Sequence, residues 1–442
     1  MRVGFLCVAT CVATCTAIAA APSIGLAQGG TARAISIDEA VHAAQQNAPS
    51  VVLARNSVRT SDVSIKQTTL GYLPSLALSA TANQRGGTQL INGVPLGFSG
   101  SPWSYSRGLN SSLTLWDGGQ RYYNLRAAES NRSANEANET LQRYQTALNV
   151  KTQYFAVLAA REQDAAAHRQ LEQAQQQLVV ASTKMMAGTA TRSDSLSAAV
   201  AVGQAKLSIL NAQNGLGNAN AALTRLVGSA TLVTAVIADT SDVGVINVSE
   251  DELARIATDG PAIRQSQATL TAAGATHKAA TAPYMPQVAM TGSYSWTPEG
   301  SKGFDFGDGV SSKSTALGFS VSYNVFNGYN REATLANAKI SEENAMANLR
   351  DARLAAVQNL TTQLNSYRTA VQSIELNKLQ ISASEENLRV VQQQYNLGTK
   401  QALDVLTVQS QLDNARLSLI TARLNARSAK AQIEALIGRD LK

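Results

Sequence analysis

The sequence predicts a mixed α and β fold, in which antiparallel strand pairs are continuous with very long α-helices of coiled-coil type. Three observations predict it. The chain of 442 residues contains an internal duplication. Two tracts, 120–187 and 329–397, contain neither Gly nor Pro, which favours long helices because these residues are the strongest helix breakers. Two segments in each half alternate apolar with small polar residues, which is the period of a β-strand.

The N-terminal residues 1–27 have the pattern of a signal peptide. Arg2 precedes an uncharged apolar run, and small residues follow at the expected cleavage site. All three cysteines, Cys7, Cys11 and Cys15, lie in this segment. A cleaved, exported chain would therefore contain neither a disulfide nor a thiolate metal site. The alternative interpretation is lipidation at Cys15.

The duplication is visible as landmarks that recur in the same order about 210 residues later. The matching pairs are 72–74 with 284–286, 115–118 with 325–328, 188–189 with 398–399, and 226–228 with 436–438. Because repeats of this kind dictate architecture, each half is expected to have the same elements. We predict a first repeat over 28–228, a linker over 229–248 and a second repeat over 249–442.

Each repeat is predicted to contain two strands followed by two long helices. In the first repeat the strands span about 72–83 and 104–116, and the helices span about 119–187 and 191–227. In the second repeat the strands span about 286–296 and 316–326, and the helices span about 328–397 and 401–438. A helix as long as 120–187 would run about 100 Å. Apolar residues in the helices recur at spacings of three and four, which is typical of a coiled coil.

The strand pairs have the alternation of outer-membrane strands, apolar toward lipid and small or polar toward a lumen. An ordinary half-buried antiparallel sheet is the alternative. The expected mature chain has no run of about 20 apolar residues that could form a membrane helix. Four strands are too few to close a barrel, so a barrel would have to be shared by several copies. Two copies would supply eight strands and three would supply twelve.

Enzymatic and nucleic-acid functions find little support in the sequence. The three histidines, His42, His168 and His277, are isolated in sequence from acidic or nucleophilic partners, and we expect them to be solvated helix residues. No phosphate loop, metal-ligand cluster or catalytic triad motif is present. Lys and Arg are scattered rather than clustered, which disfavours a nucleic-acid interface. We therefore expect no catalytic activity, no cofactor, no metal and no nucleic-acid partner.

The stretch 395–406, followed by 412–442, resembles the second hairpin tip and last helix of the TolC family of outer-membrane channels. The resemblance covers essentially residues 35–442. It implies a homotrimer with a twelve-stranded barrel in outer-membrane lipid and an α-helical periplasmic tunnel. It also implies an exit duct for efflux or type I secretion. The implied partners are a periplasmic adaptor and an inner-membrane transporter of RND, MFS or ABC type. A periplasmic coiled-coil adaptor without a pore of its own is the alternative.

The resemblance also implies roles for acidic residues at the predicted tips. Asp404 lies in the first turn of the last predicted helix, where its ordinary role is to complement the positive end of the helix. In a trimer, three copies of Asp404 would form an anionic periplasmic constriction. Thr407 stands where the family often has a second acid, so we expect weaker cation binding here.

A closed-state contact, which we call the tip lock, is the second implication. In this lock Tyr395 and Lys400 of the second tip would bond to Ser193 and Asp194 of the first. Lysine replaces the family's arginine, so the bidentate contact is lost and the lock is expected to be weak. Tip turns and adaptor docking are assigned to Gly188, Thr189, Gly398 and Thr399. Glycine at these positions suits a left-handed helix end.

Overall fold

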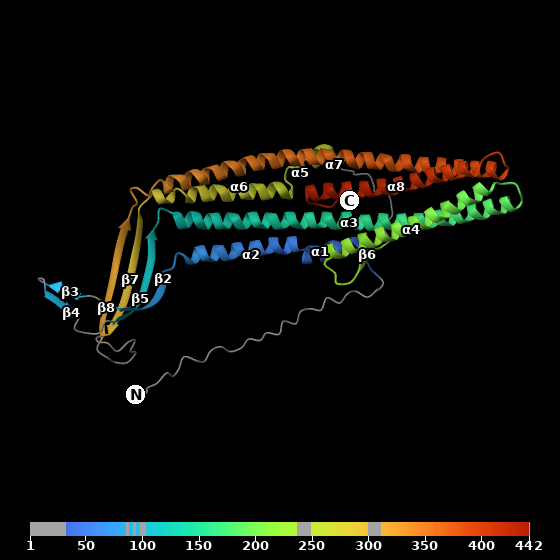
Figure 1. Ribbon diagram of the computed structural model, residues 1–442. Helices are drawn as coiled ribbons and strands as arrows, with labels where there is room; N and C mark the ends of the chain where they lie inside the picture. The colour runs from blue at the N-terminus through green and yellow to red at the C-terminus, as the bar shows by residue number, and fades with distance from the viewer. Residues whose placement is uncertain are drawn as a thin grey trace, which may run out of the picture.

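The computed structural model describes residues 32–84, 88–91, 94–97, 103–236, 249–298 and 311–441. The predicted signal peptide, the possible lipidation site Cys15 and residues 237–248 of the predicted linker lie outside these ranges. Long helices run side by side along the molecule, and a four-stranded sheet lies at one end of them (Figure 1). This arrangement confirms the predicted combination of long helices with antiparallel strands.

Two helices extend over most of the length of the molecule. Helix α3 spans Gln120–Met186 and α7 spans Asn330–Asn396, with 67 residues each, so each runs about 100 Å. At the end far from the sheet each reverses into a 36-residue helix, α4 (Arg192–Val227) or α8 (Ala402–Ile437). The chain thus forms two long helical hairpins, α3/α4 and α7/α8, whose tips lie at the same end (Figure 1).

Shorter helices cover the half of α3 and α7 nearer the sheet. They are α1 (Ile37–Asn47), α2 (Pro49–Leu70), α5 (Glu250–Ala257) and α6 (Pro261–Ala279), and the turn η1 (Ala282–Tyr284) follows α6. Proline occupies the first turn of both α2 and α6, where its missing N–H costs no hydrogen bond. Helix α2 packs on α3, and α6 packs on α3 and α7.

The main sheet consists of β2 (Ser75–Gln84), β5 (Trp103–Trp116), β7 (Gln287–Pro298) and β8 (Ser311–Ser322). The strands are antiparallel in the order β2-β5-β7-β8, so β2 and β8 form its two edges. Between β2 and β5 the chain forms a small hairpin, β3 (Thr88–Ile91) with β4 (Val94–Gly97).

The last predicted strand, 316–326, is displaced in the structure toward the N-terminus. Strand β8 pairs with β7 from Ser311 opposite Pro298 to Ser322 opposite Gln287. Beyond Ser322 the partner strand has ended, so the alternating residues that follow have no ladder to join. They lead instead into an elbow, where Tyr329 adopts a positive φ of 65°, a conformation that a residue with a Cβ adopts only with strain.

One face of the sheet gathers its large apolar side chains. Leu78 pairs with Leu109, Met290 with Phe319, and Val288 with Val321, and directly paired residues point to the same face. Most of these side chains are uncovered in the single chain: Leu78 is 80% exposed and Val321 72%, whereas Val288 and Met290 are half-buried. The opposite face carries small polar pairs such as Ser75 with Ser112, whose hydroxyls lie 2.8 Å apart. Among the described helices, none has a long enough apolar stretch to cross a membrane.

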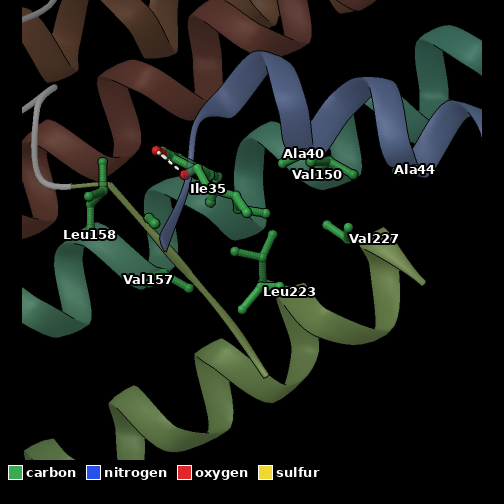
Figure 2. Packing of buried hydrophobic residues seen from close by; sticks show 11 residues of the cluster. Ile35, Ala40, Ala44, Val150, Val157, Leu158, Leu223 and Val227 are labelled. Carbon is green, nitrogen blue, oxygen red and sulfur yellow. Dashed lines mark hydrogen bonds between the residues drawn. The ribbon is translucent and has the colours of Figure 1, made fainter. Parts of the chain in front are cut away.

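The largest apolar cluster lies where the first hairpin meets a short parallel ladder, β1 (Arg33–Ile35) with β6 (Val233–Ala235). Figure 2 shows its side chains converging from α1, α3, α4 and the ladder. The Tyr154 hydroxyl donates to the Ile35 carbonyl at 3.1 Å. The ladder therefore fastens the chain that precedes α1 to the chain that follows α4.

Candidate functional site

The two hairpin tips turn by the same backbone geometry. Gly188 and Gly398 have φ of 74° and 78°. The N–H of Thr189 donates to the Lys184 carbonyl at 2.9 Å, and the N–H of Thr399 donates to the Gln394 carbonyl at 3.0 Å. With the N–H of each glycine bonded one turn back, both tips are Schellman motifs. Glycine is favoured at each tip because the left-handed conformation disfavours a Cβ.

Both returning helices begin with a capping box. The N–H of Thr191 donates to Asp194 Oδ2 at 2.9 Å, and the N–H of Gln401 donates to Asp404 Oδ2 at 3.0 Å. The structure thus places Asp404 at the predicted helix start, with its side chain 42% exposed and its other oxygen 3.9 Å from Lys400 Nζ. Thr407 donates its hydroxyl to the Leu403 carbonyl at 2.8 Å. Each aspartate therefore already has a local structural role.

Ser193 and Asp194 lie near Tyr395, but the four residues of the tip lock do not bond to one another within the chain. Tyr395 is buried, at 7% exposed, and its hydroxyl makes no hydrogen bond among the described residues. Burial raises the pKa of Tyr395, and the nearby Asp194 carboxylate raises it further. Lys400 faces Asp404, and Asp194 caps its own helix. The lock of Tyr395 and Lys400 with Ser193 and Asp194 stays a prediction. It would require contacts between neighbouring copies of the chain.

The residue that does join the two tips is Lys184, which the sequence reasoning missed. Its Nζ donates to the Tyr395 carbonyl at 2.6 Å and lies 3.9 Å from the centre of the Tyr395 ring. Lys184 stands one turn before Gly188, in the last turn of α3. A basic residue at that position is a recognised helix-end signal. The signal does not reveal that the side chain crosses to the other hairpin.

A cavity of about 690 Å³ opens between the hairpins just above the tips. All four long helices line it. Glutamine amides and apolar side chains are present in similar numbers, and Ser193, Tyr395 and Asp413 also contribute. Gln409 Nε2 spans it to donate to Gln173 Oε1 at 2.6 Å. Burial raises the pKa of the Asp413 carboxyl above its usual value. The cavity therefore brings uncharged hydrogen-bonding groups and one partly buried acid to the interface of the hairpins.

Polar contacts of this kind also join the hairpins farther from the tips. Lys151 Nζ donates to Glu434 Oε2 at 2.7 Å and to Asp440 Oδ1 at 2.6 Å. The buried apolar clusters, in contrast, each draw their residues from one half of the chain. Apolar packing thus holds each half together, whereas hydrogen bonds and ion pairs contribute strongly to the contact between the halves.

Two histidines have acidic neighbours, against the expectation that all three are isolated. His168 Nε2 lies 3.9 Å from Asp164 Oδ1, one turn earlier in α3. His277 Nδ1 on α6 lies 2.6 Å from Oε2 of Glu342, which belongs to α7. The expectation is wrong here because α6 packs on α7 and brings together residues that are far apart in sequence. Within the described ranges, no group of three or more His, Cys, Asp or Glu side chains is placed to hold a metal ion.

Comparison with known families gives a match over both halves of the chain. The outer membrane efflux protein family matches residues 40–229 and 255–439. The chain belongs to this family. The match confirms the resemblance seen in the sequence and places the protein in the outer membrane, with its long helices in the periplasm. The outer membrane efflux protein family consists of channels rather than enzymes.

Solved structures show the same fold at low sequence identity. The structure is similar to CusC, with 19% identity over 94% of this chain and 96% of that chain, at a TM-score of 0.79. It is also similar to the Neisseria gonorrhoeae MtrE outer membrane channel, with 22% identity over 94% of each chain and a TM-score of 0.75. The Campylobacter jejuni CmeC outer membrane channel is similar as well, with 17% identity over 94% of this chain and 91% of that chain, at a TM-score of 0.76. A search of curated protein sequences gave no match.

Proposed function

We propose that several copies of this efflux protein form a continuous exit duct, with a shared β-barrel in the outer membrane and a helical tunnel in the periplasm. The observation that carries the proposal is the apolar sheet face, which is left uncovered by the chain itself. Phe319, at 68% exposed, and its neighbours would contact lipid. The edges β2 and β8 must then find partner strands, because each unsatisfied backbone group in lipid costs several kcal/mol.

The order of the elements supports a closed ring of copies. Strand β8 leads into α7 at one edge, and β2 lies at the other. Taken over their whole length, α3 packs on α4 and α8, and α7 packs on α8, so the long helices follow the order α4, α3, α8, α7 with α4 and α7 outermost. A second copy of the chain can pair its β2 with β8 of the first copy. The same placement brings its α4 against α7 of the first copy. Repeating that heterologous contact closes a ring, and three copies would supply the twelve strands of the proposed homotrimer.

Exposed apolar side chains mark the helical part of this contact. Leu207 and Leu210 lie exposed on α4, and Leu376 and Leu379 lie exposed on α7. Because α4 begins at the tips and α7 ends there, the two pairs lie at similar heights. Their spacing of three residues suits packing between neighbouring helices. We therefore assign these residues to the interface between copies in the tunnel wall.

The passage itself is proposed to carry small molecules, because efflux is the activity for which the family is named. A face of α7 and α8 between 362 and 432 is lined by threonine, serine, asparagine and glutamine, with a few alanine and leucine side chains. Such uncharged groups would impose little charge selection along the wall. Selection would then fall to an inner-membrane transporter of RND, MFS or ABC type. A periplasmic adaptor would dock at the tip turns, and three copies of Asp404 would narrow the entrance.

Two experiments test this function. In a deletion strain, increased sensitivity to antibiotics, dyes or metal ions with an unchanged secreted proteome supports efflux. Loss of one secreted protein without any change in sensitivity would instead assign type I secretion. Detergent-dependent oligomers in the outer-membrane fraction support the channel. Release of a monomer by salt or osmotic shock would favour the adaptor alternative, against which the family match and the apolar sheet face both argue.

A further inference from the structure

We infer that Lys184 holds the two hairpin tips together and thereby sets how readily the tunnel entrance opens. Its Nζ reaches from α3 to the carbonyl and ring of Tyr395 at the end of α7. Within residues 183–194 and 394–404, no other hydrogen bond or ion pair joins the two tips. The inference rests on the proposed duct, because only a duct has an entrance at this end.

The contact suits the end of α7. The last four carbonyls of a helix lack partners within it, and they carry partial negative charge. Helix α7 has no basic residue in its own last turn, whereas α3 has Lys184 in its last turn. The Tyr395 carbonyl accepts from the Gly398 N–H at 3.1 Å and from Lys184 at 2.6 Å. Lysine from one hairpin therefore completes the helix end of the other.

Both partners are fixed to the rigid part of their own hairpins. The Tyr395 ring belongs to a buried cluster that includes Val391, Val405 and Leu412 of α7 and α8. The Lys184 carbonyl accepts the Thr189 N–H in the Schellman motif of the first tip. A single lysine thus connects the backbone turn of one tip with the apolar cluster of the other. Separation of the tips would break a charge-assisted hydrogen bond and a cation–π contact together.

The Lys184 bridge differs from the tip lock in its chemistry. The lock would depend on Lys400, whose side chain is 46% exposed, and on the partly exposed carboxylate of Asp194. Exposed pairs of that kind contribute little. Lys184 is partly buried, and its acceptor is a carbonyl that cannot be neutralised by acid. Substitution of Lys184 should therefore affect opening more than substitution of Lys400.

Distances between the tips test the bridge without reference to transport. All three cysteines lie in the predicted signal peptide, so labels can be introduced at Met186→Cys and Leu397→Cys, which are 77% and 80% exposed. Pulsed electron paramagnetic resonance would measure the label-to-label distance in the purified full assembly, with labelled chains diluted by unlabelled ones. We expect Lys184→Met to lengthen and broaden this distance, and Lys184→Arg to preserve it.

Lys206→Met serves as the matched control, because Lys206 is an exposed lysine of the same hairpin. In bilayer recordings the open fraction should rise about tenfold in Lys184→Met and remain unchanged in the control. Unchanged distances in a Lys184→Met protein of normal helicity would overturn the bridge, as would an equal or larger effect of Lys400→Met. If the distances shift but the assembly never conducts, the bridge stands and the proposed duct fails.

Discussion

The contact of Lys151 with Glu434 and Asp440 gives a stability prediction for the joint between the two halves. Burial lowers the pKa of Lys151, but hydrogen bonds to Asp440 and Glu434 outweigh it, so the pKa is raised overall. Lys151→Met keeps the length of the side chain and removes its charge. Glu434, whose side chain is only 11% exposed, then loses its cation.

The expected loss follows from the burial of each partner. Breaking a buried ion pair by removing one member costs about 3–5 kcal/mol. Asp440 is 80% exposed and adds little, and the Leu441 N–H still donates to Glu434 at 3.1 Å. We therefore expect Lys151→Met to lower the free energy of unfolding by about 2 kcal/mol, which should lower the midpoint of thermal unfolding by several degrees.

The assay is thermal unfolding of the detergent-solubilised protein, with Lys339→Met as the control, since the Lys339 pair with Glu343 is exposed and 3.8 Å long. Combining Lys151→Met with Glu434→Gln should cost less than the sum of the single changes, because both remove the same contact. A midpoint equal to that of the control, with additive single and double variants, would refute the reasoning.

Three further predictions concern the sheet, the tips and the cavity. Phe319→Arg should reduce the amount of protein in the outer-membrane fraction, because arginine on a lipid-facing strand costs about 2–4 kcal/mol, whereas Ser320→Arg on the opposite face should insert normally. Gly398→Ala should destabilise the protein by about 1 kcal/mol, because alanine disfavours the positive φ at this position. Gly118→Ala should cost more, because its added Cβ would also lie 2.5 Å from a backbone carbonyl oxygen. Denaturant unfolding of the two variants would compare these losses. Burial favours the protonated form of the Asp413 carboxyl and so raises its pKa. The folded protein is therefore most stable, with respect to this group, in acid, and it loses stability as the pH rises through that pKa. Asp413→Asn should raise the unfolding midpoint at pH 7 and make it less dependent on pH, and an unchanged pH profile would contradict this assignment.

The long helices and their turns could be predicted because local sequence determines them. The absence of Gly and Pro from 120–187 fixes one continuous helix, and Gly188 marks its end. Thr191 and Asp194 form the expected capping box, since both partners lie within one turn. Alternation likewise identified the strands, but it could not fix the bounds of β8, which depend on where β7 ends.

Contacts between elements distant in sequence could not be predicted in the same way. Lys184 reaches Tyr395 only because α3 packs beside the second hairpin, and no periodicity within α3 indicates that neighbour. The pairing of His277 with Glu342 depends in the same way on the packing of α6 against α7. A sequence pattern shows which side of a helix is apolar, whereas the polar residues that join two halves become visible only when the halves are placed together.

The central claim is that several copies of the chain enclose a water-filled passage through a lipid bilayer. Single-channel recording from the purified mature protein in planar bilayers tests it most directly. We expect discrete, reproducible conductance steps from the detergent-purified assembly. Bilayers that stay silent, although the protein is folded and sediments with the lipid, would contradict the account.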